Sequence, residues 1–233
     1  MSYYNNRRRK SKPNPTTQLK KLRKENPDIQ PVIVGKKLAE SWWAQAWNAN
    51  LESYADYSNR IGRGRTYVRN GSVLDLSVKP GEVSSLVQGT SANPYEITIE
   101  IEPLSKDRWN AIIDKCSRSV ANLEDLVSGK FPQELMELFT NKDEGLFPSP
   151  EEIKFHCSCP DWASMCKHIA ATLYGIGARF DSDPTLFFHL RDIDFADLLK
   201  KSVEEKMENM LKNAGKVTSR VITDTDTFEL FGV

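Results

Sequence analysis

Apolar side chains recur every three or four residues in three parts of the chain, which predicts three amphipathic helical regions. The first covers residues 41–57, with Ser41 as a suitable N-cap. The second covers residues 105–140 and includes a short second helix at about 132–139. The third covers residues 194–212, with Asp194 as N-cap and Gly215 after its end. The three stripes are Trp43, Trp47, Leu51 and Tyr54; Trp109, Ile112, Ile113, Cys116, Val120 and Leu123; and Phe195, Leu198, Leu199, Val203, Met207, Met210 and Leu211.

These stripes are open to more than one use. The tryptophans of the first region could stack on nucleic-acid bases, but regular helical spacing favours packing in a core. The 194–212 helix is expected to pack on the protein's own core, with docking on a partner as the alternative. Cys116 is expected to be a buried structural thiol. The final FELFGV segment at 228–233 could be a docking motif or a last strand.

Between the first two helical regions, alternating apolar and polar residues predict strands. Residues 95–101 alternate strictly, and residues 66–69, 73–78 and 83–88 are the other candidates. Asn70-Gly71 predicts a two-residue hairpin turn, Pro80-Gly81 predicts a second turn, and residues 61–65 predict a basic loop. We therefore expect an α+β fold whose sheet is a small antiparallel meander of three to four strands.

Composition narrows the class of protein. The 233 residues are 39% hydrophobic and 27% charged, which is typical of globular proteins and excludes collagen-like, mucin-like and wholly disordered chains. No run of about 18 apolar residues is present, and the basic N-terminus lacks the apolar region of a secretory signal. We expect a cytoplasmic protein with no membrane partner.

The formal net charge of zero is the sum of two unequal parts. Residues 1–37 carry eleven basic and two acidic side chains, a balance of +9, so residues 38–233 carry −9. Four prolines interrupt residues 1–31, and we predict a flexible basic arm. The arm could contact nucleic-acid phosphates or serve as a solubilising tail. The candidate phosphate contacts are Arg7, Arg8, Arg9 and Lys10 in the arm and Arg63, Arg65 and Arg69 in the body, where the alternative is a solvated face.

Three of the four cysteines and one histidine fall within twelve residues, as Cys157, Cys159, Cys166 and His168. Thiolates and imidazole suit a tetrahedral Zn(II) site. Two cysteines one residue apart in an extended strand or a knuckle point to the same side, and the other two ligands enter at the first turn of a helix. Four ligands leave no open coordination position, which indicates a structural zinc site in a small ββα-like unit.

Zinc explains these residues better than the alternative chemistries do. A Cys157–Cys159 disulfide would be strained, a Cys–His nucleophilic pair leaves the clustering unexplained, and an iron–sulfur site usually needs four thiolates. His156 is a rival ligand, but strand geometry points it away from both sulfurs. His189 is expected in the core or at its boundary. No H-E-x-x-H motif is present, so a metallohydrolase is disfavoured.

The motif CSCPDWASMCKH at 157–168, followed by the helical segment IAATLY, resembles the SWIM zinc finger. The WW-containing helix, the segment RGRTYVRNGSVLDLSVKPGEVSSLVQGT and PYEITIEI are similar to bacterial SWIM zinc-finger proteins, which are typically encoded beside Snf-type helicase-like ATPases. The resemblance covers about residues 40–190. It implies a zinc-binding module that binds DNA or protein partners, with no enzymatic activity.

We therefore predict a non-catalytic zinc-binding protein with no small-molecule substrate. It would bind nucleic acid, DNA in the first place, as an accessory to a helicase-like ATPase. The alternative is a protein-interaction module that does not bind nucleic acid. The expected parts are a basic arm at 1–37, an α+β N-terminal domain at 38–145, a SWIM finger at 146–190 and a C-terminal helix and tail at 191–233.

Overall fold

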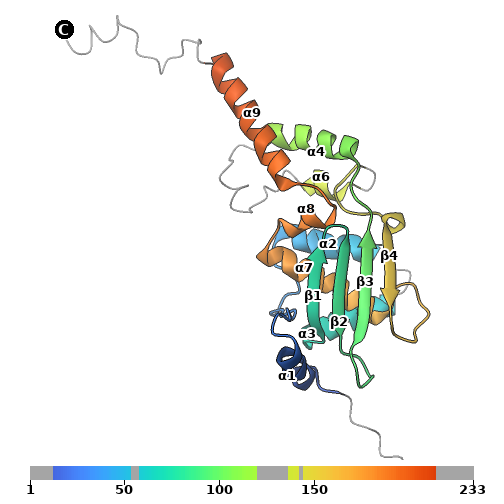
Figure 1. Cartoon of the computed structure of the whole chain (residues 1–233). Helices are drawn as coiled ribbons and strands as arrows, with labels where there is room; N and C mark the ends of the chain where they lie inside the picture. Colours follow the sequence, from blue (N-terminus) through green and yellow to red (C-terminus); the bar gives the residue numbers. More distant parts are fainter. Residues whose placement is uncertain (1–12, 54–57, 120–135, 142–143, 214–233) are drawn as a thin grey trace, which may run out of the picture.

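The computed structural model describes residues 13–53, 58–119, 136–141 and 144–213 (Figure 1). The predictions for Arg7, Arg8, Arg9, Lys10 and the FELFGV segment lie outside these residues. Within the described ranges, no helix combines the length and the apolar character needed to cross a membrane.

Helices and strands are both present, which confirms the predicted α+β class. The strands are β1 (Val73–Lys79), β2 (Glu82–Val87), β3 (Tyr95–Ile101) and β4 (Ile153–Cys157). The helices are α1 (Pro15–Glu25), α2 (Trp42–Ser53), α3 (Ser58–Arg69), α4 (Lys106–Ser119), α6 (Met136–Thr140), α7 (Lys167–Ser182), α8 (Leu186–Leu190) and α9 (Phe195–Asn213), with a 3-10 turn η2 (Pro150–Glu152).

The sheet is the predicted antiparallel meander, in the order β1-β2-β3-β4. Its fourth strand is β4, which pairs with β3 so that Cys157 lies opposite Ile97. The helices α2, α3 and α7 cover one face of the sheet, as Figure 1 shows. This pairing brings the first cysteine of the predicted metal motif to an edge of the sheet.

The prediction for residues 61–69 was wrong, because the expected loop and strand form most of helix α3. Ile61, Gly64 and Val68 lie on one buried face of this helix, and their packing outweighs the low helix propensity of glycine. Asn70-Gly71 is therefore not a hairpin turn. Gly71 follows the end of α3 with φ +67°, as is common for a residue that terminates a helix.

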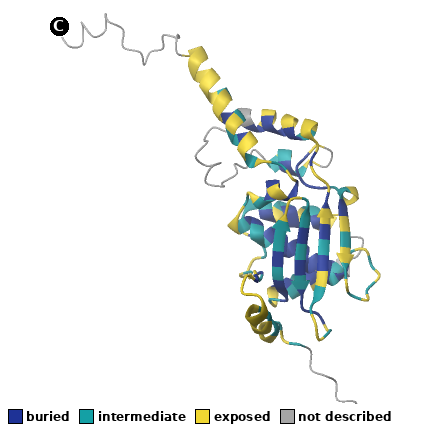
Figure 2. Ribbon diagram, in the orientation of Figure 1, coloured by how far each residue is buried: buried dark blue, intermediate teal, exposed yellow. Residues whose placement is uncertain are grey.

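The expectation of an arm without regular structure is also corrected, because α1 lies inside it. Asn14 caps α1, its side chain accepting a hydrogen bond of 2.9 Å from the Thr16 N–H. Pro15 occupies the first turn, where a proline favours a helix rather than breaking it. The helix has no buried residue, and Figure 2 shows it as an exposed element.

The core forms around α7 and joins segments that are distant in sequence. Trp47 is fully buried, and its indole N–H donates to the Leu173 carbonyl over 3.0 Å. The core interpretation of the tryptophan stripe therefore holds for Trp47, which cannot stack on a base. Ser41 caps α2 as predicted, accepting from the Ala44 N–H over 3.3 Å. One apolar cluster includes residues from 32 to 198, on both sides of the divisions predicted at 145 and 190.

The remaining helices extend this core beyond the end of the sheet. The predicted stripe is buried from Trp109 to Cys116 in α4, whereas its last two members, Val120 and Leu123, lie outside the described residues. Asp194 caps α9 as predicted, accepting from the Ala196 N–H over 2.8 Å. The inner half of α9 packs against α4 through Leu198, whereas its outer half exposes apolar side chains (Figure 2).

Replacing Gly64 with alanine should destabilise the fold, because α3 and α7 approach closely there. The added Cβ would lie 2.6 Å from the Ala170 Cβ, and we expect a loss of about 1–3 kcal/mol in the free energy of unfolding. Gly62→Ala on the same helix is the control. Its Cβ meets nothing within 4 Å, so stability should be unchanged or higher by up to about 1 kcal/mol. Equal denaturation midpoints for the two variants would contradict this packing.

Candidate metal centre

Four side chains gather where β4 leads towards α7. Cys157 ends β4, Cys159 follows two residues later, Cys166 is the N-cap of α7 and His168 lies in its first turn. Their ligand atoms all lie within 4.8 Å of one another. The structure therefore assembles the complete predicted Cys₃His set, which could hold a metal ion such as zinc.

Two hydrogen bonds between Ser158 and Glu96 hold the chain between the first two cysteines in place. The Ser158 N–H donates to the Glu96 carbonyl, and the Ser158 hydroxyl accepts from the Glu96 N–H, both over 3.0 Å. The chain bends at residues 158–160, directly after β4. This bend leaves the sulfurs of Cys157 and Cys159 within 4.8 Å of each other. At the second ligand pair, the Cys166 carbonyl accepts from the Ala170 N–H over 3.0 Å, the first turn of α7.

His168 turns its Nδ1 towards the sulfurs, 3.9 Å from the Cys157 Sγ and 3.8 Å from the Cys166 Sγ. The ring is 1% exposed. It packs on Tyr95 with ring centroids 4.4 Å apart and meets the edge of Tyr67 at 5.4 Å. These contacts fix the ring plane, so the imidazole is oriented before a metal binds.

The other two histidines lie apart from the cluster. His156 is exposed on β4, as strand geometry predicted. His189 is exposed too, which corrects the expectation of a core or boundary position. Helix α8 instead buries Phe187, Phe188 and Leu190.

The separations of the donors fit a tetrahedral ion. Zn–S bonds of about 2.3 Å and Zn–N bonds of about 2.0–2.1 Å at tetrahedral angles require donor atoms roughly 3.6–3.8 Å apart. The two sulfur–nitrogen distances of 3.9 and 3.8 Å lie close to this range. Three sulfurs and one nitrogen are also the donor types that zinc prefers. The residues present therefore fit a zinc ion.

The electrostatics of the four side chains show why a cation suits the cluster. A hydrogen bond with the Cys157 thiol is the main cause that lowers the pKa of Cys166 to about 3. The same bond, with burial, raises the pKa of Cys157, and burial raises that of Cys159. The neighbouring thiol of Cys157 therefore favours a thiolate at Cys166. A bound dication would allow all three sulfurs to ionise.

Cys116 has no part in this cluster. It is buried in the α4 stripe, and burial raises its pKa to about 12. The thiol therefore remains protonated at neutral pH, which makes it a poor nucleophile and metal ligand. The prediction of a buried structural thiol is confirmed.

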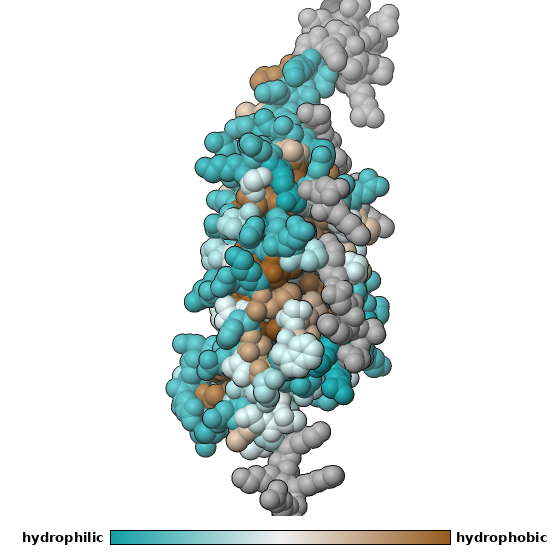
Figure 3. Space-filling model, turned by 90° about the vertical axis from the view of Figure 1, so that its right-hand side faces the viewer, coloured by the Kyte–Doolittle hydropathy of each residue, from teal (hydrophilic) through white to brown (hydrophobic). Residues whose placement is uncertain are grey.

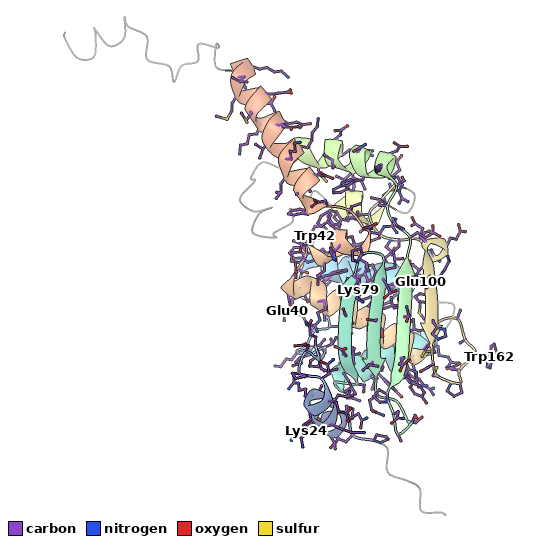
Figure 4. All side chains as sticks on the ribbon, in the orientation of Figure 1. Lys24, Glu40, Trp42, Lys79, Glu100 and Trp162 are labelled. Atoms are coloured by element: carbon purple, nitrogen blue, oxygen red, sulfur yellow. The ribbon has the colours of Figure 1, made fainter. Side chains whose placement is uncertain are left out.

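The loop between the two ligand pairs is anchored and carries an exposed tryptophan. Asp161 forms an ion pair with Arg60 of α3 and accepts a hydrogen bond from the Ala163 N–H. The adjacent Trp162 is 93% exposed, and in Figure 4 it projects from the loop away from the sheet. We name residues 160–165 the metal loop.

Three residues of the site were not identified from the sequence. Tyr67 and Tyr95 pack on His168, and Gly89 leaves room for the rings of Tyr95 and His168. A Cβ at Gly89 would lie 2.4 Å from Tyr95 and 2.8 Å from the His168 Nε2. Local sequence patterns do not reveal them, because they lie far from the four ligands along the chain. Tyr67 belongs to α3 and Tyr95 to β3.

Helix α3 places the predicted arginines on two different flanks. Arg63 follows Arg60 by three residues on the side of the metal loop. Burial chiefly raises the pKa of nearby Tyr67, and the positive charge of Arg63 opposes that shift. Arg65 and Arg69, four residues apart, lie on the other flank and line a separate hollow. The structure therefore divides the expected basic patch in two.

Comparison with known proteins yields a relative without a described activity. The chain is 37% identical over 163 residues to "Uncharacterized protein Rv2102" of Mycobacterium tuberculosis. The match covers 70% of this chain and 58% of the relative, so the chain spans less than two thirds of that protein's length. No protein-family model matches the chain, and no solved structure matches it.

The metal centre predicts about one zinc per chain by elemental analysis. Cys159→Ser and His168→Gln should each lower that content, because each removes one of four ligands. Each should also lower the Tm by roughly 4–8 °C, as expected for a loss of about 2 kcal/mol in a chain of this size. His156→Gln, an exposed neighbour outside the cluster, should change neither quantity. Retention of zinc by both ligand variants would contradict this site.

Proposed function

We propose that this chain is a non-catalytic, SWIM-type zinc-binding protein that binds nucleic acid, DNA in the first place, as an accessory to a helicase-like ATPase. The observation that carries the proposal is the closed Cys₃His cluster at the junction of β4 and α7. The sequence resembles the SWIM zinc-finger family, in which the zinc ligands have this spacing.

A structural role for zinc follows from the ligand count and burial. Four protein donors fill a tetrahedral shell, so no position remains for water or substrate. Cys166 and His168 are buried, which limits access to an ion from that side. When bound, zinc would supply cross-linking between the sheet edge and α7. Cys157 and Cys159 would hold it from the strand, and Cys166 and His168 from the helix.

Nucleic-acid binding is supported by the metal loop and its neighbour α3. Trp162 presents nearly its whole ring to solvent, and an exposed ring is a surface on which an unpaired base can stack. The Asp161–Arg60 ion pair ties this loop to the flank of α3 that bears Arg63. An aromatic platform beside a cation is the combination that binds single strands without sequence preference.

The charge of α1 supports the same proposal. Its exposed cations are Lys20, Lys21, Arg23 and Lys24, and its one acidic residue is Glu25. None of these side chains is buried. A helix with such an excess of exposed positive charge can contact phosphates while contributing little to the core.

Trp162→Ala should weaken binding of a single-stranded oligonucleotide, because it removes the stacking surface. The expected loss is about 1–3 kcal/mol, or roughly five- to 150-fold in Kd. Trp162→Phe keeps an aromatic ring and should lose less. Fluorescence anisotropy at two salt concentrations would measure both, and wild-type binding should fall as salt rises. An unchanged Kd for Trp162→Ala would count against the platform.

A protein-interaction module is the second candidate function, and α9 favours it. Val203, Met207, Met210 and Leu211 lie on one side of its outer half and are exposed. Figure 3 shows apolar surface near the upper end of the molecule, over this part of α9. Methionine-rich apolar faces adapt readily to partner surfaces.

This candidate predicts that Met207→Gln/Met210→Gln weakens binding to a Snf-type ATPase encoded in the same genome. The exchange removes apolar contact area without adding charge. Glu208→Gln/Lys212→Gln, on the side of the same helix away from these methionines, is the control and should bind as the wild type does. Calorimetric titration of purified proteins would measure the difference. Equal affinity of both double variants would exclude the α9 face as the contact.

A further inference from the structure

A hollow of about 490 Å³ opens on the flank of α3 that faces away from the metal loop. It lies among α2, α3, α7 and the segment that precedes α2. Four cationic residues line it: Lys36, Lys37, Arg65 and Arg69. The one acidic residue among its described lining residues is Glu52, so the lining carries a formal charge of four minus one, or +3. No part of the metal centre contributes to it.

The single carboxylate is already engaged. Arg65 Nη2 lies 2.5 Å from Glu52 Oε1, and the Tyr174 hydroxyl donates to the same oxygen over 2.6 Å. Arg65 Nε also donates to the Tyr174 hydroxyl over 2.8 Å. Glu52 therefore neutralises Arg65. Among the residues that the structure describes, Lys36, Lys37 and Arg69 have no carboxylate within ion-pair distance.

The two lysines lie on a segment that α7 holds at both ends. At its start, Arg179 donates to the Gln30 carbonyl over 2.8 Å and to the Pro31 carbonyl over 3.2 Å. At its end, the Asp181 carboxylate accepts from the Glu40 N–H, the Ser41 N–H and the Ser41 hydroxyl over 2.6–2.8 Å. These bonds fix the course of the chain around Lys36 and Lys37.

The third cation is positioned independently. Arg69 is exposed in the last turn of α3, one turn beyond Arg65, whose side chain is fixed by Glu52 and Tyr174. Three cations from two separate segments, each without a carboxylate partner in the described part of the chain, thus surround one opening. The positive charges of these side chains repel one another, and a multiply charged anion with several acceptor oxygens relieves that repulsion.

We propose that this hollow binds a phosphate group. Arginine can donate two parallel hydrogen bonds to phosphate oxygens, and the two lysines supply compact positive charges. Lys36, Lys37 and Arg69 are all exposed, so a phosphate in a polymer backbone can reach them as well as a free one. The choice of a nucleic-acid backbone as the source of this phosphate rests on the proposed nucleic-acid function.

The test compares two triple variants of the zinc-loaded, 233-residue chain. Lys36→Gln/Lys37→Gln/Arg69→Gln removes these three cations. Lys79→Gln/Lys106→Gln/Lys200→Gln removes the same charge from exposed positions outside the hollow. Binding to a single-stranded DNA oligonucleotide is measured by anisotropy over a salt series. The Tm is measured with inorganic phosphate and with chloride at equal ionic strength.

We expect the hollow variant to bind the oligonucleotide roughly tenfold or more weakly than the control variant, with a smaller salt slope. That result supports the hollow with a backbone phosphate as its ligand. If wild type binds no oligonucleotide but phosphate raises its Tm, and the hollow variant loses that rise, the hollow stands with a free phosphate ligand. The nucleic-acid function then fails.

Two outcomes would overturn the hollow. In the first, both triple variants bind the oligonucleotide equally well, and phosphate does not distinguish them. Binding would then come from diffuse charge or from the metal loop, and the proposed function would stand without the hollow. In the second outcome, wild type binds neither the oligonucleotide nor inorganic phosphate.

Circular dichroism and zinc content should match wild type for both variants, because all the exchanged side chains are exposed.

Discussion

Burial of α7 on almost all of its sides is the constraint on which the rest of the structure depends. From His168 to Gly177 every residue of this helix is buried, and so is Phe180. The sheet lies on one side and α2 and α3 on another, so the helix is apolar around most of its circumference. Small residues allow this enclosure, since Gly64 meets Ala170 and Gly175 meets Leu76.

The metal centre lies at the N-terminal end of that same helix. Two ligands come from α7 and two from the sheet edge, so the cluster connects elements that the apolar core already brings together. The Ser85 and Thr172 hydroxyls, 2.6 Å apart, make a polar link between β2 and α7 within this core. Metal binding and core packing therefore both hold α7 in its position against the sheet. This coupling is why ligand loss should be felt as a loss of stability.

Helix α3 separates two kinds of surface. Its buried face packs on α7, one flank meets the metal loop through Arg60, and the other bears Arg65 and Arg69 beside the hollow. A helix rotates by about 100° per residue, so arginines close in sequence face different surroundings. The chain thus holds an exposed aromatic ring on one side of α3 and a cationic hollow on the other.

The sequence by itself determined the elements whose signals are local. The four ligands fall within twelve residues, the strands β1 to β3 alternate, and Ser41 and Asp194 cap their helices through bonds to residues two or three positions away. Tertiary structure alone decided the rest. It made residues 61–69 a helix, because contact with Ala170 outweighs the glycine propensities, and it made β4 the fourth strand by pairing with β3. It also brought Lys36 and Lys37 beside Arg69, and Tyr95 onto His168. Such contacts join segments tens of residues apart, and they depend on which surfaces α7 buries rather than on any local pattern.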